Sequence, residues 1–326
     1  MMPIRVGVVG AGHIATIAQL PTLVQRDDVE LQALVSRRED PSSLQRRWGF
    51  KHVYRTVEQM LDGESLDAVF VLTPRGEHVE AVERALSAGV DVFCEKPLAT
   101  ATADAVRLAE MAEERGRVLM VGFNRRFAPT YVAAREAFGA TGATFCVAQK
   151  NRAGSEYRAT FENAIHMVDL LRWFCGGEVV HVAAAAAGSD SWEEDGSAAL
   201  IRFSTGNTGV LVAARTAGAW GEKLDAHGQM RSAEVIAPDS VAITDQGVRT
   251  IRTMSPEKFG WATATETFGF ADAVHHFLDR IRDRQEPLTS GWEAAKTQRL
   301  LDQILQAAGL PIEEQEGREW SSKAVQ

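Results

Sequence analysis

Short apolar runs alternate with segments of helical periodicity over the first 122 residues. Ile4–Val9 is a compact apolar run, followed by glycines and then by a helical pattern that continues through Leu23. Leu31–Val35 is interpreted as a second strand, and the continuously apolar Leu66–Leu72 is typical of a strand buried on both faces. Strands alternating with helices predict right-handed crossovers and a mostly parallel sheet. The same reasoning predicts a helix over Val79–Leu86 that Gly89 ends, a strand over Asp91–Cys94, a helix over Thr102–Arg115 and a strand over Val118–Val121.

The pattern changes after Gly122, where a second structural region is expected to begin. From Val179 to about Val248, successive strands are divided by turn signals, and no long crossover helices separate them. These strands are therefore expected to pair mainly antiparallel. The run Ala183–Ala187 is interpreted as a tightly packed strand. Further elements are predicted as helices over Ala128–Phe138, Asn163–Phe174, Glu266–Arg282 and Trp292–Ala308, and a strand over Ala143–Gln149.

A glycine-rich turn lies directly after the first strand. Gly10-Ala11-Gly12-His13-Ile14-Ala15 has the spacing G-x-G-x-x-A between a strand and a helix. Gly10 permits a tight turn, Gly12 lets the backbone approach a pyrophosphate, and Ala15 allows close packing of helix and sheet. The free N–H groups and positive dipole end of the following helix favour phosphate. The turn predicts a dinucleotide site, with His13 and Ile14 among the cofactor-binding residues.

These patterns define the expected architecture. The fold class is α/β, with an N-terminal Rossmann domain (residues 1–122) built on a mostly parallel, doubly wound sheet. A C-terminal α/β domain (residues 123–326) carries a large, mainly antiparallel open sheet. The last ~15 residues are polar enough to form a disordered tail.

Composition and charge narrow the class of protein. The 326 residues suit two domains, and 45% hydrophobic with 24% charged residues indicates a packed globular protein. A net charge of -9 argues against nucleic acid or an anionic membrane as partner. No apolar run reaches the ~18 residues of a membrane helix, and the chain starts with a strand, unlike a signal peptide. The three cysteines lack CxxC or CxxH spacing, so we expect buried thiols, no metal site and a cytoplasmic protein.

The end of the second strand bears on the choice of cofactor. An acidic residue there would accept hydrogen bonds from the ribose of NAD and repel a 2′-phosphate. Here Val35 is followed by Ser36, Arg37 and Arg38, and a hydroxyl with guanidinium groups suits a 2′-phosphate. The alternative is a solvated turn whose arginines are partly neutralised by Glu39 and Asp40. NADP is therefore the expected cofactor, with NAD as the alternative.

Two motifs at the ends of later strands indicate a specific protein family. They are Leu72-Thr73-Pro74-Arg75-Gly76-Glu77-His78 and Cys94-Glu95-Lys96-Pro97. Together with the glycine loop they resemble the Gfo/Idh/MocA superfamily, which includes glucose–fructose oxidoreductase and inositol dehydrogenase. The stretches 122–127 (GFNRRF) and 165–169 (IHMVD) resemble the same family, and the similarity extends in order from residue 4 to about residue 175.

The resemblance implies roles for the motif residues. Thr73, Pro74 and His78 would line the groove beside the nicotinamide ribose, and Leu72 would also belong to the cofactor site. Glu95 and Lys96 would lie at the topological switch region. An ammonium held between a strand and Pro97 has a defined direction and can hydrogen-bond the oxygen of a substrate undergoing hydride transfer. The alternative for Lys96 is a buried structural lysine paired with Glu95.

The resemblance also places the catalytic histidine of the family at His166. Glu162, His166 and Asp169 have the i, i+4, i+7 spacing of one helix face. The family usually has aspartate where this chain has Glu162, one methylene longer. Asp169 is interpreted either as a contact to substrate hydroxyls or as a structural residue. Arg152, Tyr157 and Arg158, just before this helix, are expected to help form the substrate pocket, with a polar surface loop as the alternative.

The residues and the resemblance together predict a reversible hydride transfer between nicotinamide and a secondary alcohol or ketone. His166 would exchange the proton, Lys96 would hydrogen-bond the same oxygen, and Glu162 would orient the imidazole. The resemblance implies a sugar, sugar derivative or cyclitol as substrate, bound by the C-terminal domain. It also implies that this domain serves oligomerisation, as a homodimer or homotetramer through its exposed sheet face. Three alternatives known in the superfamily stay open: a glycosidase that uses bound NAD transiently, a non-catalytic ligand-binding regulator, and a reductase of flatter, apolar substrates.

Overall fold

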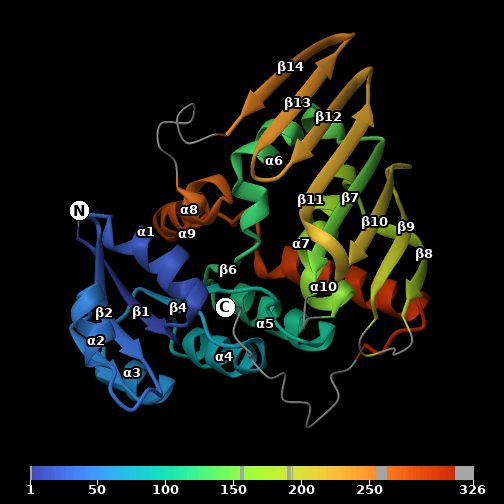
Figure 1. Ribbon diagram of the computed structural model, residues 1–326. Coiled ribbons are helices and arrows are strands. Elements are labelled where there is room, and N and C mark those ends of the chain that lie inside the picture. The colour runs from blue at the N-terminus through green and yellow to red at the C-terminus, as the bar shows by residue number, and fades with distance from the viewer. Residues whose placement is uncertain (1, 155–157, 189–191, 193, 255–262, 313–326) are drawn as a thin grey trace. The chain divides into compact units, whose positions relative to one another are not determined.

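The computed structural model describes residues 2–154, 158–188, 192, 194–254 and 263–312 (Figure 1). The chain forms two compact units, each of which contains more than one stretch of sequence. The predicted division at residue 122 concerns sequence domains and stays a prediction, because the packing units are interleaved along the chain. Unit 1 comprises Met1–Ala133, Pro238–Ser240 and Arg252–Gln298, and unit 2 comprises Ala134–Ala237, Val241–Ile251 and Arg299–Gln326.

Unit 1 contains a parallel sheet of six strands in the order β3-β2-β1-β4-β5-β6. The strand order reverses beside β1, which is the switch point at which open α/β sheets bind ligands. The predicted parallel sheet is confirmed, although no pattern had indicated the three-residue β3. The strands are β1 (Ile4–Val9), β2 (Val29–Val35), β3 (His52–Tyr54), β4 (Ala68–Val71), β5 (Asp91–Cys94) and β6 (Leu119–Val121).

The sheet of unit 1 is buried between helices that come from distant parts of the chain. All four residues of β4 are buried, which explains its continuous apolar character. Phe277 packs edge-on against Phe70 and Phe93, with ring centroids 5.3 and 5.7 Å away. The helical segments of this unit are η1 (Ala15–Gln19), α1 (Leu20–Val24), α2 (Ser42–Trp48), α3 (Val57–Gly63), η2 (Arg75–Glu77), α4 (His78–Ser87), α5 (Thr102–Glu114), η3 (Asn124–Phe127), α8 (Ala264–Thr267) and α9 (Phe270–Asp283).

The second sheet has eight strands in the order β14-β13-β12-β11-β7-β10-β9-β8. Strands β7 and β10 pair in parallel, whereas β11 with β7 and β12, and β9 with β8 and β10, pair antiparallel. The expectation of a mainly antiparallel sheet is therefore confirmed. The strands are β7 (Phe145–Ala153), β8 (Val179–Ala187), β9 (Gly196–Phe203), β10 (Thr208–Ala214), β11 (Thr216–Gly228), β12 (Arg231–Ile236), β13 (Ser240–Asp245) and β14 (Val248–Thr253).

Helix α7 (Ile165–Cys175) packs on β7 and β10 and follows the π-helical turn η5 (Ala159–Asn163). The alanine run forms the end of β8, but its prediction as a tightly packed strand is wrong. Strand β8 lies at an edge of the sheet and most of its residues are exposed, because only β9 pairs with it.

The remaining helices are α6 (Pro129–Glu136), η4 (Gly139–Thr141) and α10 (Gly291–Ala307). Among the described residues, none of the helices combines the length and apolar character needed to cross a membrane.

Candidate active site

The glycine loop has the backbone geometry that its sequence predicts. Gly10 adopts a positive φ of 87°, and a Cβ atom there would lie 2.9 Å from Cγ2 of Thr73. Only glycine fits both the conformation and the space. A Cβ added to Gly12 would meet open space, so the backbone is accessible at this point. His13 and Ile14 follow at exposed positions before η1.

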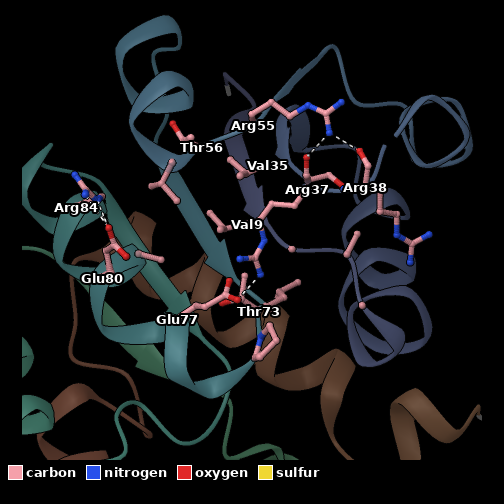
Figure 2. A pocket seen from close by; sticks show the side chains of 18 of the residues that line it. Val9, Val35, Arg37, Arg38, Arg55, Thr56, Thr73, Glu77, Glu80 and Arg84 are labelled. Atoms are coloured by element: carbon pink, nitrogen blue, oxygen red, sulfur yellow. Dashed lines mark hydrogen bonds and ion pairs between the residues drawn. The ribbon is translucent and has the colours of Figure 1, made fainter. Parts of the chain in front are cut away.

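A cavity of about 550 Å³ lies at the carboxyl ends of β1, β2 and β4 (Figure 2). It brings together predicted cofactor-binding residues from three separate segments of unit 1. Sequence reasoning did not predict the opposite wall, which comes from the β3–α3 connection, the start of α3, η2 and α4. In total, four arginines and three glutamates line the cavity. The predicted residues in the lining are Gly10, Gly12, Ser36, Arg37, Arg38, Leu72, Thr73 and Pro74, and the additional charged residues are Arg55, Glu58, Glu77, Glu80 and Arg84.

The turn after β2 is held by an arginine that the sequence did not reveal. The Arg55 guanidinium donates hydrogen bonds to the backbone carbonyls of Ser36 (3.4 Å) and Glu39 (3.1 Å), and also to that of Arg38. The Ser36 hydroxyl accepts the backbone N–H of Arg38 at 3.3 Å. The Arg37 guanidinium instead forms an ion pair with the Glu77 carboxylate. The backbone of this turn is thus fixed, while the Arg37 side chain is engaged across the cavity.

The His78 side chain contacts both motifs that carry the family resemblance, the one at residues 72–78 and the one at residues 94–97. Its Nδ1 lies 2.7 Å from the carbonyl oxygen of Pro97, and its Nε2 lies 2.8 Å from that of Thr73. Burial lowers the pKa of the ring, although the two carbonyls favour the protonated form. A neutral ring donates to only one of the two carbonyls. His78 therefore braces the ends of β4 and β5, and its predicted place beside the ribose stays a prediction.

The Glu95 carboxylate sits in a polar cluster of unit 1. Its Oε2 accepts the backbone N–H of Lys96 at 3.2 Å, and Oε1 accepts a hydrogen bond from the buried amide of Gln19. Burial raises the pKa of Glu95, and the charges of Lys96 and Arg125 oppose that rise. A Cβ atom at Gly122 would lie 3.1 Å from Oε1, so a larger residue there would press on the Glu95 carboxylate. The peptide bond between Lys96 and Pro97 is cis.

The candidate catalytic residues of unit 2 are distributed over two helical segments. His166 lies in α7 and is 8% exposed, whereas Glu162 lies in η5, so one continuous helix does not carry both. Oε2 of Glu162 accepts the backbone N–H of Arg158, at the start of η5, at 2.8 Å. This contact caps the π-helical turn, which precedes the histidine. Asp169 is completely buried, which favours its structural interpretation.

The predicted substrate residues are only partly within the described chain. Arg152 donates from Nε to Oδ1 of Asn163 at 3.1 Å and thereby links β7 to η5. Tyr157 lies outside the described residues. The large sheet also contains a buried ion pair that sequence reasoning missed, in which Nζ of Lys150 lies 2.7 Å from the Glu222 carboxylate. No motif indicated this pair, because its members are 72 residues apart.

A parallel sheet with this strand order, a glycine loop and a cavity at the switch point define a dinucleotide-binding α/β protein as the class. Residues 4–123 match the family model "Oxidoreductase family, NAD-binding Rossmann fold", and residues 147–234 match the "GFO/IDH/MocA C-terminal domain". The chain is 30% identical over 325 residues to "Putative oxidoreductase YceM" of Salmonella typhimurium, covering 93% of this chain and 98% of that protein. The protein belongs to the GFO/IDH/MocA oxidoreductase family, which confirms the resemblance.

Other relatives are named for their reactions. Myo-inositol 2-dehydrogenase of Thermotoga maritima is 29% identical over 231 residues, covering 65% of this chain and 69% of that protein. A 3-ketoreductase from Actinomadura kijaniata, solved with TDP-benzene and NADP, has the same fold with a TM-score of 0.78. That structure is 24% identical and the match covers 94% of this chain and 98% of the other. The protein is thus an NAD(P)-dependent dehydrogenase or reductase of this family.

Proposed function

We propose that this protein transfers a hydride reversibly between NADP and a secondary alcohol or ketone of a sugar, sugar derivative or cyclitol. The observation that carries the proposal is the cavity at the ends of β1, β2 and β4. Gly10 and Gly12 offer backbone to a pyrophosphate there, and Ser36, Arg37 and Arg38 offer a hydroxyl and two guanidinium groups. The named activities of the relatives support a carbohydrate-like substrate.

The preference for NADP is argued from charge. The first acidic residue after β2 is Glu39, and three residues with donors precede it. Guanidinium groups bind a phosphate dianion with charge-assisted hydrogen bonds, each worth about 1.5–3 kcal/mol. An NAD-selective site would instead place a carboxylate at the end of this strand to accept the ribose hydroxyls.

The proposed chemistry assigns one task to each side chain. When bound, the nicotinamide ring supplies or accepts the hydride. Lys96 donates a hydrogen bond to the reacting oxygen and stabilises negative charge that develops on it. His166 delivers the proton in reduction and accepts it in oxidation, since an imidazole titrates near neutral pH. Glu162 caps η5 through Arg158, and we propose that it also favours the protonated ring of His166.

The outer face of the large sheet supports an oligomer as a further part of the proposal. Leu200 is 43% exposed and lies opposite the half-buried Val210, which in turn lies opposite the half-buried Val147, so three apolar side chains share this face and all are at least partly accessible. Contiguous exposed apolar surface is typical of interfaces. We propose a homodimer or homotetramer through this face. A monomeric mass by light scattering, at micromolar concentrations, would contradict it.

The experiment that tests the function is a substrate screen with a matched pair of lysine variants. Sugars, sugar acids and cyclitols are supplied with NAD or NADP, and reduced nicotinamide is followed by its absorbance. For a substrate found in this way, Lys96→Met should lower turnover by ~10²-fold or more, with little change in cofactor affinity. Lys51→Met removes a surface lysine paired with Glu30 in the same unit and should leave turnover unchanged.

The outcomes separate the alternatives. Glycoside hydrolysis without net cofactor turnover would replace the proposal by the transient-oxidation mechanism. Cofactor binding without turnover of any tested sugar or cyclitol would favour the regulator. Wild-type turnover in Lys96→Met would overturn the role of Lys96 and leave the reaction itself in place.

A further inference from the structure

An ion pair crosses the mouth of the candidate cofactor cavity. Arg37 follows β2, and Glu77 lies in η2 after β4, so the pair connects the ends of two strands (Figure 2). Both residues line the cavity. The Arg37 side chain is 73% exposed and that of Glu77 is 38% exposed. Water therefore reaches both partners, and the pair is of the weak, exchangeable kind.

In the turn after β2 the backbone is fixed, whereas the side chain of Arg37 can exchange its partner. Arg55 holds the carbonyls of Ser36, Arg38 and Glu39, which anchors the backbone on both sides of Arg37. The guanidinium of Arg37 is bound through a side-chain carboxylate instead. An anion that enters the cavity can therefore take over the guanidinium without any rearrangement of the turn.

The three glutamates of the cavity are not equivalent. Glu58 and Glu80 both pair with Arg84, on the α4 side of the cavity. Of the three, only Glu77 forms an ion pair with Arg37, which is one of the two arginines that follow Ser36. The carboxylate of Glu77 thus occupies a group that the 2′-phosphate of NADP would need.

We propose that Glu77 sets the cofactor selectivity of this enzyme by competing with the ribose 2′-phosphate for the Arg37 guanidinium. The inference rests on the proposed function, because it requires Arg37 to bind that phosphate. NADP must displace Glu77 from Arg37, whereas NAD carries no phosphate at this position and leaves the pair intact. Glu77 therefore weakens the binding of NADP and reduces the difference in affinity between NADP and NAD.

The test compares the dissociation constants of NADPH and NADH by fluorescence titration of the full-length protein. Glu77→Gln keeps the size of the side chain and removes its charge. It should tighten NADPH binding by about fivefold, the scale of a lost surface ion pair, and change NADH binding by less than about twofold. Glu80→Gln is the matched control, because it removes a charge from the same cavity that is paired with Arg84, and it should change the NADPH-to-NADH ratio little.

Arg37→Ala distinguishes failure of this inference from failure of the proposed cofactor site. It should weaken NADPH by about tenfold, and Arg37→Ala combined with Glu77→Gln should bind NADPH no more tightly than Arg37→Ala alone. If Arg37→Ala weakens NADPH but Glu77→Gln has no effect or also weakens it, competition is overturned while the cofactor site stands. If Arg37→Ala leaves NADPH binding unchanged, the proposed 2′-phosphate site and the inference both fail.

Discussion

The charged groups of the cofactor cavity and those of the large sheet are used in opposite ways. In the cavity, Arg37 and Glu77 pair at the surface, with side chains 73% and 38% exposed. In the sheet, Lys150 of β7 and Glu222 of β11 pair with side chains 3% and 0% exposed. An exposed pair is worth about 0–1 kcal/mol, so a ligand can replace one partner. A buried pair is costly to break, because the remaining charge has lost its water. Exchangeable charges suit ligand binding, and buried charges fix a scaffold.

The largest effect is expected in the sheet. Glu222→Gln keeps the size of the side chain and removes the charge that faces Lys150. Breaking such a buried pair costs on the order of 3–5 kcal/mol, which corresponds to a fall of about 10 °C in the unfolding midpoint. Calorimetry of the unliganded protein measures this change.

A second pair in the same sheet provides the control. Glu234 of β12 binds Arg249 of β14 through two hydrogen bonds, but the side chains are 43% and 47% exposed. Glu234→Gln should lower the midpoint by no more than about 2 °C. Equal shifts for the two variants would show that burial does not separate these pairs.

An intermediate effect is expected at Gln19, which is a buried polar residue of unit 1. It tests whether the enzyme's activity also depends on buried polar groups of the unit that carries the candidate cofactor cavity. Gln19→Leu removes the amide that donates to Glu95 and should raise the pKa of that carboxyl further. We expect turnover to fall by about tenfold, the scale of one hydrogen bond to a charged group. The acidic limb of the pH–rate profile should move to higher pH.

Gln19→Glu sharpens this test, because a second carboxylate beside Glu95 should move the limb further in the same direction. A purely structural Gln19 would lower the yield of folded enzyme in both variants without moving the profile. In that case Gln19 is not a positioning residue for Glu95.

The smallest effect is expected at Asp28, whose side chain is 26% exposed. The hydrogen bonds from Arg26 lower its pKa from 3.8 to about 2. Because the pKa is lower in the folded protein, the stabilisation is fully present above pH 3.8 and is lost as the pH falls towards 2. After allowance for screening, Asp28→Asn should cost about 1 kcal/mol at pH 7. Urea unfolding should show the two proteins converging below pH 4; a constant difference would contradict the linkage.

The sequence predicted those features that depend on local pattern. Strand Ile4–Val9 agrees with β1 residue for residue, and the G-x-G-x-x-A turn has the positive φ that Gly10 allows. The sequence did not predict the partners of the side chains, because residues such as Arg37 and Glu77 are 40 positions apart. The role of Arg55 was also hidden, since its partners are backbone carbonyls, which every residue possesses.

The second region shows a different limit. The spacing of Glu162, His166 and Asp169 assumed one regular helix, but a π-helical turn ends at Asn163 and α7 begins at Ile165. Apolar periodicity cannot distinguish a π turn from an α turn over so short a stretch. The parallel pairing of β7 with β10 was likewise invisible, because a strand pattern carries no direction.

The position of α9 in the sequence has a consequence for biosynthesis. Phe277 covers Phe70 and Phe93, yet the ribosome makes it long after both strands have left the exit tunnel. Until α9 emerges, Phe70 and Phe93 of the nascent sheet lack the ring that packs edge-on against them. A truncated polypeptide that ends at residue 122 would lack this contact permanently. Chaperone binding and aggregation during synthesis should therefore concentrate on nascent chains in which β4 and β5 have left the exit tunnel and α9 has not.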